Sequence, residues 1–309
     1  MGTDMDKKQI KPHQPSMSVD EQIANLCSKG LIIEDMAYAY SILSDISYFR
    51  LIKAYSLGLK AKNGDYHKNI RFDDIVQLYF FDANLRQHLF IEIEKVEINL
   101  RCRISNYFSG KYGVIGYEDI GNFAMSDSDF QDFSSEIQKE ISRKKRTPFI
   151  VNFQDNYIDS KVPLYALVEI MSFGTLSKFY KNMKNDDKKA IAQQYGIGYT
   201  YFESWLEHLS YVRNICAHYS RLYNAKMTKT PRLYKHYTST GISNNRVFAT
   251  FLTLKHILPN DRHWDEFLQT IELLVEKYPS VKLPYIGFPR DWAEILRRKA
   301  KPDDDFTSQ

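Results

Sequence analysis

The longest periodic stretch of the chain reads RFDDIVQLYFFDANLRQHLFIEIEKVEINLRCRISNYF and covers residues 71–108. Its apolar side chains recur every three or four residues, the spacing that places them on one face of an α-helix. The residues on this face are Ile75, Leu78, Tyr79, Leu85, Leu89, Ile93, Val96 and Leu100. The pattern ends near Gly110, so it predicts one long helix, a kinked helix, or two helices in succession.

Helical patterns also fill most of the chain on either side of this stretch. Ser18 and Glu21 have the spacing of a capping box at the start of a helix. Further helices are predicted over residues 34–55, 136–146, 163–183, 186–196, about 200–223, 246–258, 264–278 and 290–300, with a break near Gly174. The 13 glycines and 10 prolines are few for a loop-rich sandwich or barrel, and no alternating strand pattern occurs. The sequence therefore predicts an all-α protein.

The predicted helices form a single extended helical domain over residues 18–298. Residues 1–17 are polar and predict a flexible tail, and residues 299–309, with the sequence KPDDDFTSQ at their end, predict a disordered one. We expect the segments 111–135 and 225–246, which lack periodicity, to be connections.

The cysteine content and the hydropathy pattern limit where the protein works. Cys27, Cys102 and Cys216 are far apart and odd in number, which disfavours a disulfide framework and a zinc site. No apolar run approaches the roughly 20 residues that cross a bilayer, and the polar N-terminus lacks the apolar core of a signal peptide. We therefore expect a cytoplasmic protein with no membrane partner, no metal and no cofactor.

Charge is distributed unevenly along the chain, although the net charge is only +4. The window from His208 to Asn260 contains no Asp or Glu and carries eight Lys or Arg residues. These are Arg213, Arg221, Lys226, Lys229, Arg232, Lys235, Arg246 and Lys255, and His208, His218, His236 and His256 lie among them. Such a window indicates either a solvated basic face or a surface suited to phosphate.

The same window contains the stretch RNICAHYSRLYN, residues 213–224. On a helical wheel an apolar arc is formed by Phe202, Trp205, Leu206, Leu209, Val212 and Cys216. His218 falls opposite this arc, with Asn214 one turn before it. Arg213 falls at the edge of the arc, where its guanidinium must either extend to solvent or meet a carboxylate, a phosphate or a partner chain.

These three side chains suit metal-independent cleavage of RNA. Attack by the ribose 2′-hydroxyl requires a base, an acid for the leaving 5′-oxygen, and positive charge on the phosphorane between them. Histidine exchanges protons near neutral pH, so His218 is the candidate general acid or base. Arg213 can grip two phosphate oxygens, and Asn214 can donate to phosphate or orient the imidazole. The products would carry 2′,3′-cyclic phosphate and 5′-hydroxyl ends.

The stretch YVRNICAHYSRLYN (211–224) resembles the signature of the Abi-like (AbiD/AbiF) abortive-infection family of bacteria. Three other stretches resemble the family in order: KPHQPSMSVDEQIANLCSKGLIIED (11–35), IEIEKVEINLRCRISNYF (91–108) and PLYALVEIMSFGTLSKFY (163–180). The resemblance spans nearly all of residues 11–295. It implies membership of the HEPN superfamily: a helical bundle, here with additional helices, whose R-x4–6-H motif commonly acts as a metal-independent ribonuclease.

The resemblance assigns the motif positions to Arg213 and His218 and the polar position after the arginine to Asn214. It implies phage defence or toxin–antitoxin behaviour, in which a small non-coding RNA restrains some members. HEPN nucleases generally combine two motifs, and this chain has one, so we expect a homodimer with a composite active site. Residues 101–106 echo the motif as R-x4-N and could be a degenerate second copy; otherwise Arg101 and Arg103 pair with acids or contact phosphate.

The first hypothesis is therefore a dimeric endoribonuclease of the HEPN type. The residues expected to hold its RNA are Tyr219, Arg221, Asn224, Lys226, Lys229, Arg232 and Lys235. Two alternative hypotheses do not include RNA cleavage. One is a non-catalytic RNA-binding protein or sensor, and the other is a helical protein–protein module in which the motif only stabilises the fold.

Overall fold

A computed structural model describes residues 15–157, 159–259 and 261–298 of the chain. Within these ranges the chain is mostly helical, with isolated bridges but no strand, which confirms the all-α prediction. Most of the two predicted tails, residues 1–14 and 299–309, lies outside the described ranges. None of the described helices is both long enough and apolar enough to cross a membrane.

The chain groups into two compact units, residues 1–79 and 80–309. The single domain predicted over 18–298 stays a prediction. The first unit contains α1 (Val19–Ser28), α2 (Met36–Asp45), a π-helical turn at Phe49–Lys53 and the start of α3 (Phe72–Tyr112). The predicted capping box of α1 is confirmed: the Ser18 hydroxyl accepts from the Glu21 backbone N–H, and the Glu21 carboxylate accepts from the Ser18 N–H.

The second unit holds the rest of α3 and all later elements. Its helices are α4 (Asp127–Arg143), α5 (Pro148–Asn156), α6 (Leu164–Ile170), α7 (Phe173–Asn182), α8 (Asn185–Gln193), α9 (Tyr199–Ala217), α10 (Lys235–Thr238), α11 (Val247–Ile257), α12 (Arg262–Lys277) and α13 (Trp292–Arg297). Three short 3-10 turns lie at Gly116–Glu118, Ile120–Asn122 and Leu283–Ile286.

The stretch that opened the sequence analysis forms one continuous helix, α3. Among the alternatives left open by its pattern, the single long helix is the one observed. The residues predicted to share its apolar face are buried, except the half-buried Tyr79. A helix with this much apolar surface along one side must be covered along its length, and the later helices of the second unit cover its residues from Phe80 onward.

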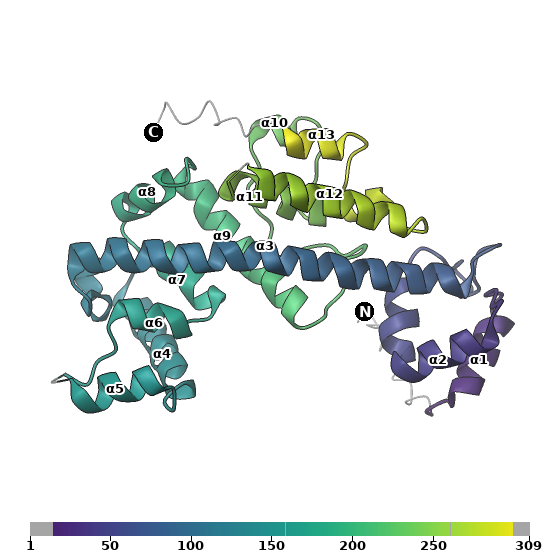
Figure 1. The fold of residues 1–309 in the computed structure, drawn as a ribbon, viewed down its shortest axis with the longest axis horizontal. Coiled ribbons are helices and arrows are strands. Elements are labelled where there is room, and N and C mark those ends of the chain that lie inside the picture. Colours follow the sequence, from purple (N-terminus) through teal and green to yellow (C-terminus); the bar gives the residue numbers. More distant parts are fainter. Residues whose placement is uncertain (1–14, 158, 260, 299–309) are drawn as a thin grey trace, which may run out of the picture. The chain divides into compact units, whose positions relative to one another are not determined.

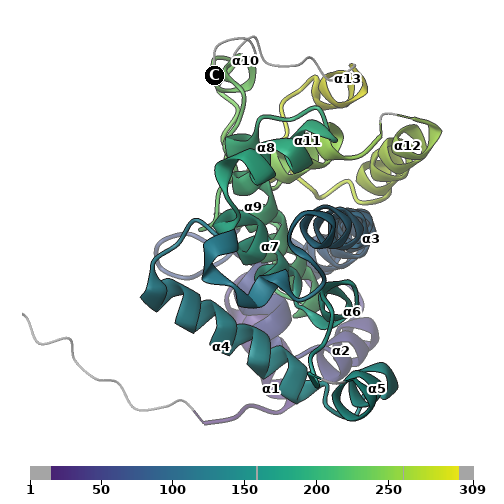
Figure 2. The same cartoon turned by 90° about the vertical axis from the view of Figure 1, so that its left-hand side faces the viewer.

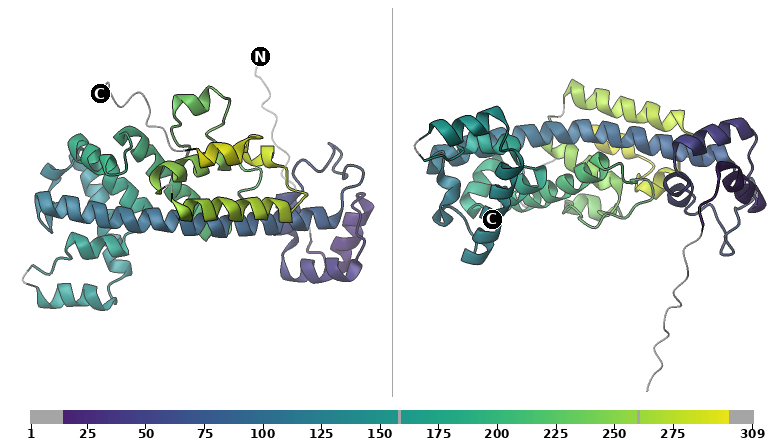
Figure 3. Two further views of the ribbon diagram at one scale, coloured as in Figure 1. Left: turned by 45° about the horizontal axis from the view of Figure 1, so that its top comes forward. Right: turned by 90° about the horizontal axis from the view of Figure 1, so that it is seen from below.

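Helices α7, α9 and α12 pack around this part of α3 (Figures 1 and 2). Figure 2 looks almost along α3 and shows α7 and α9 on one side of it and α12 on another. Helix α12 runs antiparallel beside α3 (Figure 3), because Tyr278 near its end contacts Phe81 and Asn84, whereas His263 at its start lies with Lys95. Helix α9 packs against α7, α8 and α11. The helix that carries the candidate motif is thus packed within the core of this unit.

Several predicted helix boundaries in this unit were wrong. Helix α4 begins at Asp127, well before the predicted start at 136, because the Ser126 hydroxyl caps it by accepting from the Asp129 N–H. The break predicted near Gly174 lies instead at Met171, where the helix over 163–183 divides into α6 and α7. Ser172 caps α7 by accepting from the Thr175 N–H, so Gly174 is inside the new helix.

Candidate functional site

Helix α9 carries the motif arginine at the edge of its buried face, as the wheel predicted. All six residues of the predicted apolar arc are buried. The side chain of Arg213 is 33% exposed, whereas Asn214 on the next position is exposed. Arg213 therefore lies at the border between core and solvent, where its charge needs a partner.

The motif helix ends at Ala217, earlier than the predicted end near 223. His218 is the C-cap, and Tyr219 adopts a left-handed conformation with φ 55°. The Tyr219 N–H donates to the Cys216 carbonyl at 3.2 Å and the Ser220 N–H to the Ile215 carbonyl at 2.9 Å, the two bonds of a Schellman motif. Glycine or asparagine usually occupies the left-handed position, so a tyrosine there does not predict this helix end.

A buried carboxylate on α3 fixes the chain that follows. Asp82 is fully buried, and its oxygens accept from the backbone N–H groups of Leu222 at 3.2 Å and Tyr223 at 2.7 Å. Arg86, one turn later on α3 and also buried, donates to the same carboxylate. The loop after His218 is thus held to α3 by a paired charge, and this holds the end of the motif in place.

The carboxylate that faces Arg213, that of Glu97, is also on α3. The Arg213 Nε lies 3.6 Å from a Glu97 carboxylate oxygen, too far for a hydrogen bond, and has no other hydrogen-bond acceptor. The guanidinium lies 5.6 Å from the centre of the Phe90 ring, and its Nη1 is 3.5 Å from the Asn214 side-chain oxygen. The other oxygen of Glu97 accepts from Arg101, whose Nη2 also donates to the Met171 carbonyl at 2.8 Å. One carboxylate therefore serves two arginines.

Two adjoining cavities of about 220 and 450 Å³ open around this cluster. Both are lined by Arg213, Glu97, Arg101 and Glu169. Phe90, Glu94 and Ile98 complete the smaller one, and Glu140, Lys144, Thr147, Phe149, Ile170, Met171 and Ser172 complete the larger one. We call this space the Arg213 cleft.

The carboxylates of the Arg213 cleft correct the expectation drawn from the acid-free window. That window lacks Asp and Glu in sequence, but α3, α4 and α6 bring four glutamates to the cleft: Glu94, Glu97, Glu140 and Glu169. The surroundings of Arg213 are therefore not a basic surface. Within the described ranges, no group of three or more His, Cys, Asp or Glu side chains could hold a metal ion.

Several cations of the window serve the fold instead of facing solvent. Lys255 is buried and donates to the Ile295 carbonyl at 2.6 Å, and burial lowers its pKa to about 8. Arg246 donates to the Asn224 side chain and to the carbonyls of Ala225 and Tyr285. The window thus predicted more surface charge than the structure has.

Two histidines of the window are neutral at pH 7. His208 is fully buried between the Lys229 carbonyl and the Thr250 hydroxyl, and burial lowers its pKa to about 4. Burial likewise lowers the pKa of His256 to about 3. In contrast, His218 at the end of α9 is exposed, so solvent and ligands can reach its ring.

The residues predicted to bind RNA divide into two places. Tyr219, Arg221, Asn224 and Lys226 follow the end of α9. Lys229, Arg232 and Lys235 belong to the chain that returns along the first half of α9, since Lys229 pairs with Glu207 at 2.7 Å and the Arg232 N–H donates to Ser204. Ten helical residues separate His208 from His218, about 15 Å along the axis. The second group therefore lies away from His218.

The side chains of these residues differ in their exposure to solvent. Lys226, Arg232, Lys235 and Tyr219 are exposed, the last with 68% of its surface. The Asn224 oxygen accepts from Arg246 at 3.3 Å, and the Nη1 of Arg221 is buried without a hydrogen-bond acceptor.

The arginines of the sequence echo at 101–106 behave differently from each other. Arg101 pairs with an acid, Glu97, as one of the alternatives predicted. Among the described contacts, Arg103 donates to neutral acceptors, the side-chain oxygens of Asn99 and Gln194. Whether Arg101 and Asn106 form a second motif stays a prediction.

Sequence reasoning missed the residues that support the site. The i, i+4 spacing of Asp82 with Arg86 and of Glu97 with Arg101 was readable as two helical ion pairs. Their contacts with the Leu222–Tyr223 backbone and with Arg213 join segments more than 100 residues apart, which a single sequence does not reveal.

Comparison with known proteins supports one family. Searches of curated proteins and of solved structures gave no match. The family profile for Abi-like proteins matches residues 41–224, which include the whole of α3 and of α9, with Arg213, Asn214 and His218. This match covers more than half of the chain, so the protein belongs to the Abi-like family.

Proposed function

We propose that this protein is a metal-independent endoribonuclease of the HEPN type that acts in abortive infection of phage-infected bacteria. The observation that carries the proposal is the pair of motif side chains on α9. The Arg213 side chain lines the Arg213 cleft, and its Nε has no hydrogen-bond acceptor. The His218 side chain is exposed where α9 ends. Membership of the Abi-like family supports the defence role.

Each residue would have a distinct part in the reaction. The His218 imidazole would take the proton of the 2′-hydroxyl or give one to the leaving 5′-oxygen. Arg213 would bind the phosphorane oxygens as a fork, and Asn214 would use its side-chain NH₂ to donate to phosphate, since its oxygen faces Arg213. The cyclic phosphate and the 5′-hydroxyl then follow from attack and departure at the same phosphorus.

A second copy of the chain would complete the site. Among the described contacts, none joins Arg213 to His218, and one imidazole cannot be base and acid in the same step. A twofold dimer would place His218 of each protomer near the motif of the other, which supplies both proton-transfer groups. The exposed position of His218 at a helix end suits such an arrangement.

The carboxylates of the Arg213 cleft set a condition on substrate binding. The contact between Arg213 and Glu97 is 3.6 Å long and is not a hydrogen bond. A phosphate that makes charge-assisted hydrogen bonds to Arg213 would therefore replace a weaker interaction. A regulatory RNA that restrains the enzyme as an antitoxin would find exposed cations at Lys226, Arg232 and Lys235.

The test is incubation of total cellular RNA with the purified protein in EDTA. We expect cleavage, with product 3′ ends that resist ligation until the cyclic phosphate is removed, because 2′-hydroxyl attack leaves that group. The oligomeric state would be measured on the same sample. Cleavage that requires an added divalent metal, or products with 5′-phosphate ends, would exclude the proposed chemistry.

A non-catalytic RNA-binding protein is the second candidate. The observation that favours it is the absence of a described contact between Arg213 and His218 together with the four carboxylates of the Arg213 cleft. For this candidate we expect RNA binding that weakens steeply with salt and no cleavage of any RNA.

The substitution Tyr219→Gly tests the contribution of this side chain to RNA binding separately from its effect on stability. Glycine adopts the left-handed conformation without the roughly 1–2 kcal/mol that it costs an L-residue, so we expect unchanged or slightly higher stability. Loss of the exposed ring would weaken RNA binding about tenfold, since stacking on a base contributes roughly 1–3 kcal/mol. Thermal unfolding and RNA titration measure the two effects. Tyr219→Asn is the matched control, because asparagine also tolerates this conformation, and an unchanged RNA affinity in both variants would remove Tyr219 from the site.

A further inference from the structure

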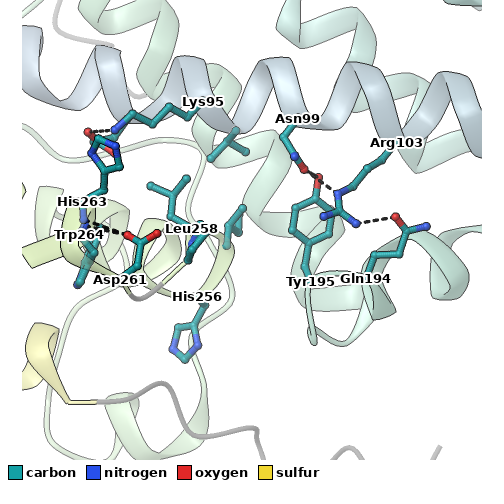
Figure 4. Close-up of a pocket in the computed structure, with 14 residues that line it drawn as sticks. Lys95, Asn99, Arg103, Gln194, Tyr195, His256, Leu258, Asp261, His263 and Trp264 are labelled. Carbon is teal, nitrogen blue, oxygen red and sulfur yellow. Dashed lines mark hydrogen bonds and ion pairs between the residues drawn. The ribbon is translucent and has the colours of Figure 1, made fainter.

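Helix α3 carries a second cavity on the face opposite the Arg213 cleft. Its volume is about 480 Å³, and Figure 4 shows its lining. The α3 residues that line it are Glu92, Lys95, Val96, Asn99 and Arg103, whereas Phe90, Glu94, Glu97, Ile98 and Arg101 line the Arg213 cleft. At about 100° per residue these two sets point in opposite directions. The two cavities therefore share a helix but no lining residue.

One end of this cavity holds the guanidinium of Arg103 among neutral side chains. Its Nε donates to the Asn99 oxygen at 2.7 Å and its Nη1 to the Gln194 oxygen at 2.6 Å, as drawn in Figure 4. The guanidinium lies 4.4 Å from the centre of the Tyr195 ring, whose hydroxyl also donates to Asn99 at 2.7 Å. These contacts hold the guanidinium in one orientation before any ligand arrives.

The charge of Arg103 is not balanced by a carboxylate. Among the described ion pairs none includes Arg103, whereas Lys95 pairs with Glu92 at 2.7 Å. The Asp261 carboxylate caps α12 by accepting from the His263 and Trp264 N–H groups. Glu92 and Asp261, the two acids of the lining, therefore contact other groups, and among the described residues no carboxylate pairs with Arg103.

The guanidinium and amide groups left over at this end are all donors. A guanidinium can only donate, so the oxygens of Asn99 and Gln194 must face Arg103, and their NH₂ groups are turned away from it. What remains for a ligand is Arg103 Nη2 with two amide NH₂ groups. A phosphate, which offers several acceptor oxygens and a negative charge, matches this set better than a neutral group does.

The other wall of the cavity is apolar. It is formed by Val96, Ile257, Leu258, Pro259 and Trp264. The cavity size falls in the range of about 300–1,000 Å³ that holds small organic ligands, which are bound by apolar walls and a few polar groups. An anion site beside an apolar wall suits a ligand with both parts.

We propose that this cavity binds a small phosphorylated organic molecule of about the size of a nucleoside monophosphate. Its phosphate lies on Arg103, and its organic part lies against the wall that includes Leu258. A strand of RNA fits less well, because it would extend into a neighbouring cavity that is also lined by Lys95 and His263. Two glutamates, Glu92 and Glu266, line that cavity and disfavour a phosphate there. The proposal does not depend on cleavage by Arg213 and His218.

The test is calorimetric titration of the full-length protein with each common nucleoside 5′-monophosphate, with the parent nucleosides and with inorganic phosphate. We expect at least one monophosphate to bind at a single site, more tightly than its nucleoside or phosphate alone. Arg103→Gln should weaken that binding about 10- to 100-fold, the effect of losing a charged hydrogen-bonding partner. Arg290→Gln is the matched control, because Arg290 is exposed and lines none of the described cavities.

A second variant keeps the test valid if Arg103→Gln does not fold correctly. Leu258→Trp fills the apolar side and leaves Arg103 with its partners, so it should also weaken binding. The proposal is overturned by any of three results: no monophosphate binds to the wild type, both variants bind as tightly as the wild type, or a short RNA but no monophosphate binds through Arg103.

Discussion

His218→Ala is expected to lower the rate of RNA cleavage by at least about a thousandfold. Proton transfer by a positioned side chain contributes roughly 10²–10⁴-fold to a reaction, and a composite dimer loses both of its imidazoles in one substitution. The melting temperature should stay within about a degree of the wild type, since the side chain is exposed at the end of α9. Single-turnover cleavage of a defined RNA, with melting measured on the same preparation, tests both statements.

The matched control is His67→Ala, which removes an exposed histidine from the other unit and should leave cleavage unchanged. Mixing His218→Ala with Arg213→Ala protomers adds information about the dimer. A mixed dimer has one His218 and one Arg213, so a site that needs both imidazoles stays inactive, whereas recovery of part of the activity would show that one Arg213 and one His218 are enough. Cleavage by His218→Ala at the wild-type rate would remove histidine catalysis from the proposal.

Asp82→Ala is expected to destabilise the second unit by about 3–5 kcal/mol. The substitution leaves the Arg86 charge buried without this carboxylate and removes the acceptor of the Leu222 and Tyr223 N–H groups. Breaking a buried ion pair by deleting one partner costs this much because the remaining charge is uncompensated. Urea unfolding gives the free energy, and amide hydrogen exchange at Leu222 and Tyr223 reports on the loop itself.

Asp132→Ala provides the comparison, since Asp132 is an exposed aspartate in α4. It should change stability by less than about 0.5 kcal/mol, as exposed substitutions usually do. We also expect Asp82→Ala to reduce cleavage more than the loss of folded protein explains, because the chain after His218 loses its anchor. Equal free energies for the two variants would show that the Asp82 network contributes little.

The sequence predicted those parts of the fold that depend on local patterns. The periodicity of residues 71–108 predicted α3, and the wheel placed Arg213 at the border of a buried arc. The predictions were wrong where the local structure depends on a residue far away in the sequence. The left-handed Tyr219 ends α9 although nothing in its own side chain favours that conformation, and Asp82 holds the following loop from another helix.

The acid-free window shows the same limit for charge. A count along the chain predicted a basic surface, but the neighbours of Arg213 in space come from α3, α4 and α6. Residues such as Lys255 and His208 were counted as surface groups and are buried. The charge pattern of a sequence predicts the surface charge of solvent-facing segments well. It predicts poorly the charge around a helix that is packed among other helices.

The sharing of Glu97 between two arginines has a consequence for which phosphate the Arg213 cleft prefers. Arg101, Arg213 and Glu97 together carry a charge of about +1, because one carboxylate offsets one of two guanidinium groups. An internal phosphodiester has a single negative charge, so bound to Arg213 it brings the triplet to neutrality while Glu97 keeps Arg101. A terminal phosphomonoester carries roughly −1.5 to −2 and would leave negative charge beside the remaining glutamates. If the proposed cleavage takes place in the Arg213 cleft, this charge balance would favour a bond within an RNA strand over one of its phosphorylated ends.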